Sequence, residues 1–231
     1  MKRLLLVLAL VAILLPGCET AKQVFGNVTN GSLGSAEIAR GLKEALRVGT
    51  DTATKHLSLV NGFFADDMIK ILMPPEAQKV ENTLRQFGMG KTVDKAVLSM
   101  NRAAEDASKY VGSILWNAIT SMTISDAIGI LRGDDFAATE YLKRSTTQQL
   151  TTAFRPIIER SLGNVDATKH WNEVFTVYNK FSRNPVNTDL PAYVTDKALA
   201  GLFYHIGLQE QQIRKNPVAR VTDILKRVFG S

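Results

Sequence analysis

The chain of 231 residues has a single cysteine, and this scarcity excludes several classes of protein. One thiol forms no disulfide within the chain, no Cys-x-x-Cys redox pair and no cysteine-rich zinc site. Seven prolines and 16 glycines are too few for a collagen-like or low-complexity chain. Because 45% of the residues are hydrophobic, the chain has enough apolar residues to bury a core.

The chain also lacks the charge pattern of a nucleic-acid-binding protein. Its 28 basic residues stand against 22 acidic ones, and the two kinds are interleaved. Aromatic and basic residues do not alternate, as they do along surfaces that bind single strands. The sequence therefore predicts a mixed, solvated surface and no nucleic-acid partner.

The first 17 residues have the three parts of a secretory signal peptide. Lys2 and Arg3 precede an unbroken apolar run of twelve residues, which Pro16 and Gly17 end. Twelve residues are too few to span a bilayer as a helix, which needs about 20. We therefore expect residues 1–17 to be removed and to take no part in the fold.

Cys18 follows this segment directly, and the sequence Leu15-Pro16-Gly17-Cys18 resembles the lipobox of bacterial lipoproteins. The resemblance implies that the Cys18 sulfur receives a diacylglycerol and that its new amine is acylated after cleavage. Pro16 departs from the pattern, where Ala or Ser is more usual. The alternatives are a plain signal peptide with an incidental cysteine, or an uncleaved anchor.

The resemblance also implies a location. Two acyl chains suffice for stable membrane anchoring. By analogy with enterobacterial sorting, Glu19 after the cysteine favours the outer membrane, facing the periplasm. Residues 18–34 are then the lipidated cysteine and a flexible tether, because residues 19–34 are rich in Gly, Asn, Ser and Thr. Sixteen such residues reach roughly 20–25 Å.

Residues 35–231 are expected to form one compact all-α domain of about ten helices, several of them short. Apolar residues recur at spacings of three and four, which predicts amphipathic helices over 36–58, 193–214 and 219–229. A longer stripe predicts a helix over 93–122 with a bend at Gly112. Gly49 lies on the first stripe, where a neighbouring helix can approach closely. Val174–Tyr178 is rich in strand-forming residues. In a wider window the apolar residues recur at helical spacing, which favours a helix that begins after an Asp166 N-cap.

Several short motifs predict where helices begin and end. Thr123–Asp126 and Ser145–Gln148 have the spacing of a capping box, which marks a helix start. Three residue pairs that contain proline predict the end of one helix or the start of the next: Pro74-Pro75, Asn184-Pro185 and Asn216-Pro217. Pro156 falls inside a helical pattern and predicts a kink or a boundary. Gly88 predicts a helix C-cap; Gly88–Thr92 is not a phosphate loop, because Arg85 stands where that motif needs glycine.

No motif predicts a catalytic, cofactor-binding or metal site. His56, His170 and His205 are far apart, and none forms a His-x-x-x-His pair. Only tertiary structure would bring them together, so we expect packed or surface imidazoles, with His205 beside Tyr204.

The strongest local pair of carboxylates is Asp134 and Asp135, after Gly133. Two acids in one turn can bind a cation or act as acid and base. They also open a predicted helix, where aspartate caps free N–H groups and favours the positive end of the dipole. The sequence favours capping, and a functional role for the pair is the alternative.

Four segments, in this order along the chain, resemble the bacterial family known as domain of unknown function 4197 (DUF4197). They are Leu42–Asp51, Gly133–Thr139, Tyr193–Phe203 and Ile213–Arg220, the last continuing to Gly230. The resemblance implies an exported, helical protein of Gram-negative bacteria. It implies no activity, and it assigns no catalytic residues.

The sequence leaves three functions open. The first is a membrane-anchored, non-enzymatic module that binds a partner or contributes structurally in the cell envelope. The second is a helical carrier of a lipid or other hydrophobic ligand. The third is an enzyme that uses carboxylates such as Asp134 or Asp51.

The lipobox generates a direct prediction. Cells that produce the chain are expected to incorporate radioactive palmitate into it, and Cys18→Ser is expected to abolish the label because the acceptor sulfur is gone. Gel autoradiography of the purified protein measures this. Equal labelling of both proteins would contradict lipidation at Cys18.

Overall fold

The computed structural model describes residues 34–163, 171, 175–176, 179–180, 185 and 189–230. The chain divides into two units, Met1–Gly34 and Ser35–Ser231, and all the helices named below belong to the second. Its described residues contain helices and no strand, which confirms the all-α prediction. The α-helices are α2 (Ser35–Leu57), α3 (Gln78–Gln86), α4 (Gly90–Ser108), α5 (Gly112–Ser121), α6 (Ile124–Leu131), α7 (Ala137–Gly163), α9 (Leu190–Lys215) and α10 (Asp223–Phe229). Two 3₁₀ helices are η1 (Pro75–Ala77) and η2 (Pro217–Ala219).

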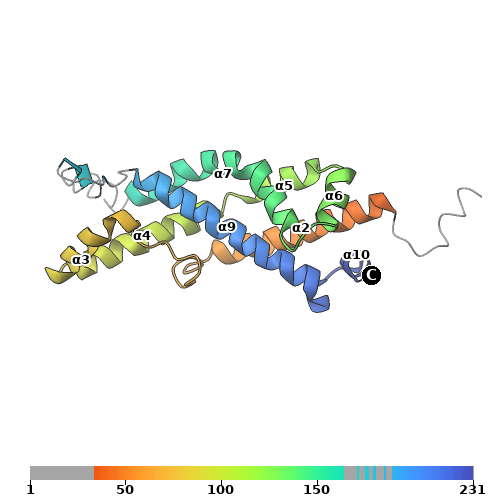
Figure 1. The fold of residues 1–231 in the computed structure, drawn as a ribbon, viewed down its shortest axis with the longest axis horizontal. Helices are drawn as coiled ribbons and strands as arrows, with labels where there is room; N and C mark the ends of the chain where they lie inside the picture. Colours follow the sequence, from red (N-terminus) through yellow and green to blue (C-terminus); the bar gives the residue numbers. More distant parts are fainter. Residues whose placement is uncertain are drawn as a thin grey trace, which may run out of the picture. The chain divides into compact units, whose positions relative to one another are not determined.

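The long helix α9 organises the core, because it packs against α7, α2 and α4 (Figure 1). The expected apolar stripe of α9 is buried, including Val194, Ala198 and Leu202. Helix α7 packs in turn on α4 and α5 and buries Leu142 and Phe154 completely. These faces join in one hydrophobic cluster, so the long helices stabilise one another mainly by burying apolar surface.

The predicted first helix is confirmed as α2, and Gly49 has the expected role. Gly49 is buried on the face of α2 that meets α9. A Cβ atom at Gly49 would lie 3.3 Å from Cβ of Gln209, which is closer than most Cβ contacts. The two helix backbones therefore approach closely at this glycine.

The stripe over 93–122 belongs to two helices and not to one bent helix. Helix α4 ends at Ser108 and α5 begins at Gly112. The N–H groups of Lys109 and Tyr110 donate to carbonyls three residues back, which tightens the last turn and ends α4. Val111 in the break is fully buried, so the apolar spacing continues across a helix break that it does not reveal.

The two predicted capping boxes have different outcomes. Thr123 and Asp126 form a complete box at the start of α6, as predicted. The prediction of a helix start at Ser145 is wrong, because Ser145 lies inside α7. Its hydroxyl donates to the carbonyl of Tyr141, 2.9 Å away, so it bonds within the preceding turn.

The glycine and proline predictions are mostly confirmed. Gly88 has φ +80 between α3 and α4, which is the conformation of a C-cap glycine. Pro75 begins η1, and Pro217 begins η2 after α9 has ended at Lys215. Pro156 marks no boundary, because α7 continues through it to Gly163. Asp166, Asn184 and most of Val174–Tyr178 lie outside the described residues.

Helices α5 and α6 meet at a sharp bend of 101°. Thr123 caps α6 at this junction and fixes the change of direction. Only this pair, taken together, has the length and apolar composition of a membrane span; no single helix in the described part of the chain has both. Both helices pack against α2.

The close packing of α9 predicts opposite effects of two glycine substitutions. A Cβ atom at Gly201 would lie 2.6 Å from the ring of the fully buried Phe63, so Gly201→Ala is expected to destabilise the fold by about 1–3 kcal/mol. Gly129 in α6 has nothing within 4 Å, so Gly129→Ala is expected to stabilise by up to about 1 kcal/mol. Urea unfolding of both variants measures this, and equal effects would contradict the close contact at Gly201.

Candidate functional site

Residues 58–74 connect α2 to η1 without forming a helix, and we call them the connecting loop. Side chains of α4 satisfy much of its backbone. The Glu105 carboxylate accepts the N–H groups of Phe63 and Phe64, at 3.1 and 3.2 Å. The Asn101 amide accepts the Ile71 N–H at 2.9 Å and donates to the Ile71 carbonyl at 2.8 Å. Both side chains are buried, so they hold the loop against the core.

The connecting loop forms one wall of an open groove against α9, which we call the loop groove. Its volume is about 470 Å³. The lining side chains are mainly apolar and aromatic, with two lysines. The main ones are Met68, Leu72 and Met73 of the loop, Tyr193 and Tyr204 of α9, and Lys70 and Lys197. A second hollow of about 250 Å³ shares Lys70, Leu72 and Met73, so the loop is accessible from both sides.

The polar groups of the loop groove are placed by specific contacts. The Tyr193 hydroxyl donates to the Leu72 carbonyl, 3.0 Å away. Burial, with a smaller effect of Glu76, raises the pKa of the Tyr193 hydroxyl, which therefore remains a donor at neutral pH. The Lys70 ammonium lies 4.2 Å from the centre of the Phe64 ring. This arrangement holds a positive charge at the rim of an apolar surface.

Both lysines of the loop groove are available to an anionic ligand. The Lys197 ammonium lies 5.6 Å from the centre of the Tyr193 ring. Within the described part of the chain, neither Lys70 nor Lys197 forms an ion pair with a carboxylate. Met68 and Leu72 beside them are 72% and 58% exposed. The groove thus offers apolar surface and unpaired positive charge at the same place.

Next to the groove, the fold brings together two of the three histidines. His56 is in the last turn of α2, Asp66 is in the connecting loop, and His205 is on α9. The His205 Nε2 and Asp66 Oδ2 atoms are 2.9 Å apart, and the His56 and His205 ring centres are 4.9 Å apart. One ligand atom from each of the three residues lies within 4.8 Å of the others.

The three residues differ in their freedom to move. His205 is buried, its side chain is 10% exposed, and its ring makes the expected edge contact with Tyr204 at 5.7 Å. The other carboxylate oxygen of Asp66 accepts the Met68 N–H at 2.9 Å, so Asp66 is held from two sides. His56 is exposed at its helix end. Two members of the cluster are therefore fixed and the third can adjust.

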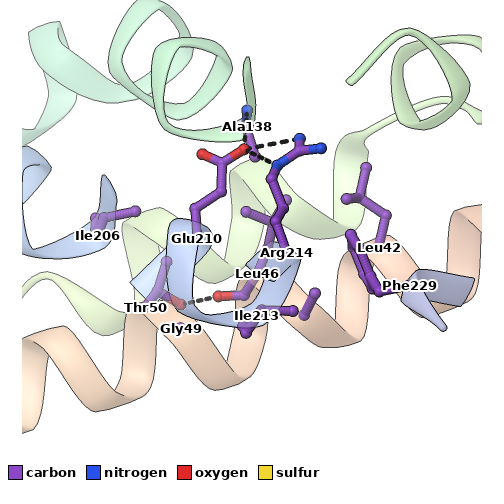
Figure 2. Close-up of a pocket in the computed structure, with 11 residues that line it drawn as sticks. Leu42, Leu46, Gly49, Thr50, Ala138, Ile206, Glu210, Ile213, Arg214 and Phe229 are labelled. Atoms are coloured by element: carbon purple, nitrogen blue, oxygen red, sulfur yellow. Dashed lines mark hydrogen bonds and ion pairs between the residues drawn. The ribbon is translucent and has the colours of Figure 1, made fainter. Parts of the chain in front are cut away.

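A separate pocket lies between α2, α9 and α10, and Figure 2 shows the residues that line it. Leu42 and Leu46 come from α2, Ile206 and Ile213 from α9, and Phe229 from α10. Its cavity is about 20 Å³, which is room for about one water molecule. The pocket is therefore a packing defect of the core and is too small for a lipid.

At the edge of this pocket, Glu210 and Arg214 of α9 form a buried ion pair at 2.9 Å (Figure 2). The Glu210 carboxylate also accepts the N–H groups of Ala138 at 3.0 Å and Thr139 at 2.8 Å, in the first turn of α7. Arg214 donates to the carbonyl of Ile130 at 2.9 Å, at the end of α6. The pair thus caps two helix ends at once.

The carboxylates singled out in the sequence have structural contacts. Asp134 accepts the N–H of Phe136 at 2.9 Å, just before α7. Asp135 forms an ion pair with Lys215 at the end of α9. Asp51 pairs with Arg47 at 3.2 Å. These contacts do not bring Asp51 together with Asp134, and a functional role for Asp134 and Asp135 stays the untested alternative to capping. Cys18 lies outside the described residues.

The sequence named His56 and His205 without joining them, and it did not single out the other residues that build the candidate site. Asn101, Glu105 and Glu210 lie on helix faces that are otherwise apolar, and each is buried. A charged or amide side chain on a buried stripe is rarely tolerated without a partner. The presence of such a residue on the stripe therefore indicates a buried polar contact, which apolar spacing alone does not detect. Asp66 and His205 are 139 positions apart, and no local pattern joins them.

The comparison with known protein families gives one match. A family model described as "Protein of unknown function (DUF4197)" matches residues 32–230, which is most of the chain. No curated protein matches the chain, and no solved structure does. The match confirms the family resemblance of the sequence segments and includes all the helices described above. It assigns no activity, ligand or catalytic residue.

The Glu210–Arg214 pair predicts a large effect on stability. Glu210→Ala is expected to destabilise the fold by about 3–5 kcal/mol, because it leaves a buried arginine and two N–H groups of α7 without their partner. Urea unfolding measures the change. The control is Glu140→Ala in the first turn of α7, which removes an exposed ion pair with Lys143 and should cost less than about 1 kcal/mol. Similar losses in both variants would contradict the capping role of Glu210.

Proposed function

Because the chain belongs to the DUF4197 family, a family of unknown function, its role has to be inferred from its own residues, and we propose a membrane-anchored binding module. The module is a bacterial envelope lipoprotein, lipidated at Cys18 and non-enzymatic. Its helical domain binds an extended segment of an envelope protein in the loop groove. The observation that carries this proposal is the groove, with its exposed apolar side chains and two lysines that form no ion pair among the described residues.

The membrane anchor rests on the sequence of the N-terminus. A short apolar run after Lys2 and Arg3 ends directly before Cys18, which suits cleavage and acylation at that residue. Two acyl chains hold a protein on a membrane stably. Glu19 supports the outer membrane, with the helical domain in the periplasm. A partner in the same compartment is then within reach of the groove.

The size and lining of the loop groove suit a polypeptide segment. A volume of about 470 Å³ lies in the range of ligand sites, which is about 300–1,000 Å³. Methionine side chains such as Met68 and Met73 adapt to partners of different shape. The ammonium groups of Lys70 and Lys197 favour carboxylates on the bound segment. The expected partner is therefore an extended segment that carries both apolar and acidic side chains.

The two other functions receive less support from the described residues. A hydrophobic-ligand carrier needs a cavity that holds a lipid chain, and the pocket of Figure 2 holds only about 20 Å³. An enzyme that uses Asp134 needs this carboxylate in a cleft, and Asp134 lines none of the hollows described above. The open groove suits recognition better than enclosure or catalysis.

Site-specific photocrosslinking in the bacterium that carries this chain tests the proposal. A benzophenone amino acid at Leu72, which is exposed in the groove, is expected to form an adduct with an envelope protein. Adding Met68→Glu is expected to reduce that adduct at least tenfold, because a negative charge enters the apolar surface that the partner covers. Immunoblotting and mass spectrometry of the adduct measure this.

The control places the same photoreactive residue at Val218, which is 85% exposed in η2 and does not line the groove. It is expected to give no such adduct, and Val218→Glu should leave the adduct at position 72 unchanged. The same adduct from both positions would contradict a specific groove. If the photoreactive residue at position 72 formed an adduct only with lipid, this result would contradict the binding module and support the carrier of a hydrophobic ligand.

A further inference from the structure

We propose that His56, Asp66 and His205 form a binding site for a divalent transition metal ion of the zinc class. The three side chains come from α2, the connecting loop and α9 and converge beside the loop groove. Neither the family match nor any sequence motif assigns a metal to this chain. The proposal rests on the geometry of the cluster, the chemistry of its donor atoms and the contacts that hold them.

The distances suit coordination after a small movement of one ring. Zinc binds histidine nitrogen and carboxylate oxygen at about 2.0–2.2 Å, so two ligands of a tetrahedral ion lie roughly 3.3–3.5 Å apart. The His205 Nε2 and Asp66 Oδ2 atoms are 2.9 Å apart, close to this separation. All the ligand atoms of the cluster lie within 4.8 Å of one another. His56 therefore has to approach by at most roughly 1.5 Å, and its exposed ring is free to do so.

The donor set selects the class of metal. Imidazole nitrogen favours zinc, copper and nickel, whereas magnesium and calcium prefer sites made only of oxygen. Two histidines and one carboxylate supply three of the four ligands of a tetrahedral zinc ion. The fourth position is then left to water or to a group of a bound partner. This is the ligand number of an open site, and not that of a closed structural one.

The surrounding contacts prepare two of the ligands. One oxygen of Asp66 accepts the Met68 N–H at 2.9 Å, which turns the other oxygen toward His205. Such outer contacts fix the orientation of a ligand and strengthen its binding to the metal. Glu105 holds Phe63 and Phe64 of the same loop against α4. The loop is therefore placed for coordination before a metal arrives.

A metal in this position would link the loop to both helices. Met68 lies two residues after Asp66 and lines the loop groove, as does Tyr204 next to His205. Coordination would fix the distance between these two walls of the groove. The metal would therefore set the shape of the surface without itself entering the groove.

Isothermal titration calorimetry with zinc chloride tests this site on the full chain in detergent. The chain carries Cys18→Ser throughout, because a free thiol also binds zinc. We expect one zinc ion per chain. His56→Gln and Asp66→Asn are each expected to weaken binding at least tenfold, since each removes one ligand. Both variants keep a polar side chain of similar size, and their urea unfolding curves show whether they remain folded.

The matched control is Asp67→Asn, which removes an exposed carboxylate one residue along the same loop. It is expected to bind zinc as tightly as the parent chain, and magnesium chloride is expected to give no saturable heat. Absence of saturable zinc binding to the parent chain would overturn the proposal. Equal weakening in Asp66→Asn and Asp67→Asn would also overturn it, because it would indicate only general attraction of cations to a negative loop.

Discussion

The hydrogen bonds between α4 and the backbone of the connecting loop are the constraint on which the candidate site depends. A loop that packs on a core without helical bonds needs partners for its N–H and C=O groups, since each buried group left unpaired costs about 1–3 kcal/mol. Glu105 and Asn101 supply such partners at Phe63, Phe64 and Ile71. The wall of the groove and the position of Asp66 both follow from this arrangement.

A second buried carboxylate, near the C-terminal end of α9, makes the same kind of contact as Glu105 of α4. Glu210 is also a buried carboxylate on a long helix, and it also accepts N–H groups from another element, here the first turn of α7. In both places an arginine neutralises the carboxylate, Arg102 beside Glu105 and Arg214 beside Glu210. A buried charge is tolerated when it is paired and hydrogen-bonded, and these two satisfy both conditions.

The sequence predicts the helices well and the site poorly, for physical reasons. Apolar spacing predicts α2 and α9 because burial against a core acts along the whole length of a helix. It does not detect the break between α4 and α5, where Val111 keeps the apolar spacing although the helix is interrupted. Ser145 shows a second limit. The capping pattern does not distinguish a hydroxyl that starts a helix from one that bonds back inside it.

The candidate site depends on contacts between residues that are distant in sequence. Cys18 stands in a local pattern, so its chemistry is predictable from its neighbours. The packing of α2 against α9 brings His56 to His205, and the connecting loop brings Asp66 to His205. Spacing along the chain contains no information on such pairs. The sequence does not predict the groove either, because its two walls, the connecting loop and α9, are far apart along the chain.

The position of α9 after the other long helices has a consequence for the order of folding. Helices α2, α4 and α7 all pack against α9, which begins only at Leu190. A ribosome adds about 5–20 residues per second, so these earlier helices are exposed for several seconds before their common partner exists. The core therefore closes only after α9 has been synthesised, and until then the apolar faces of α2, α4 and α7 lack this partner.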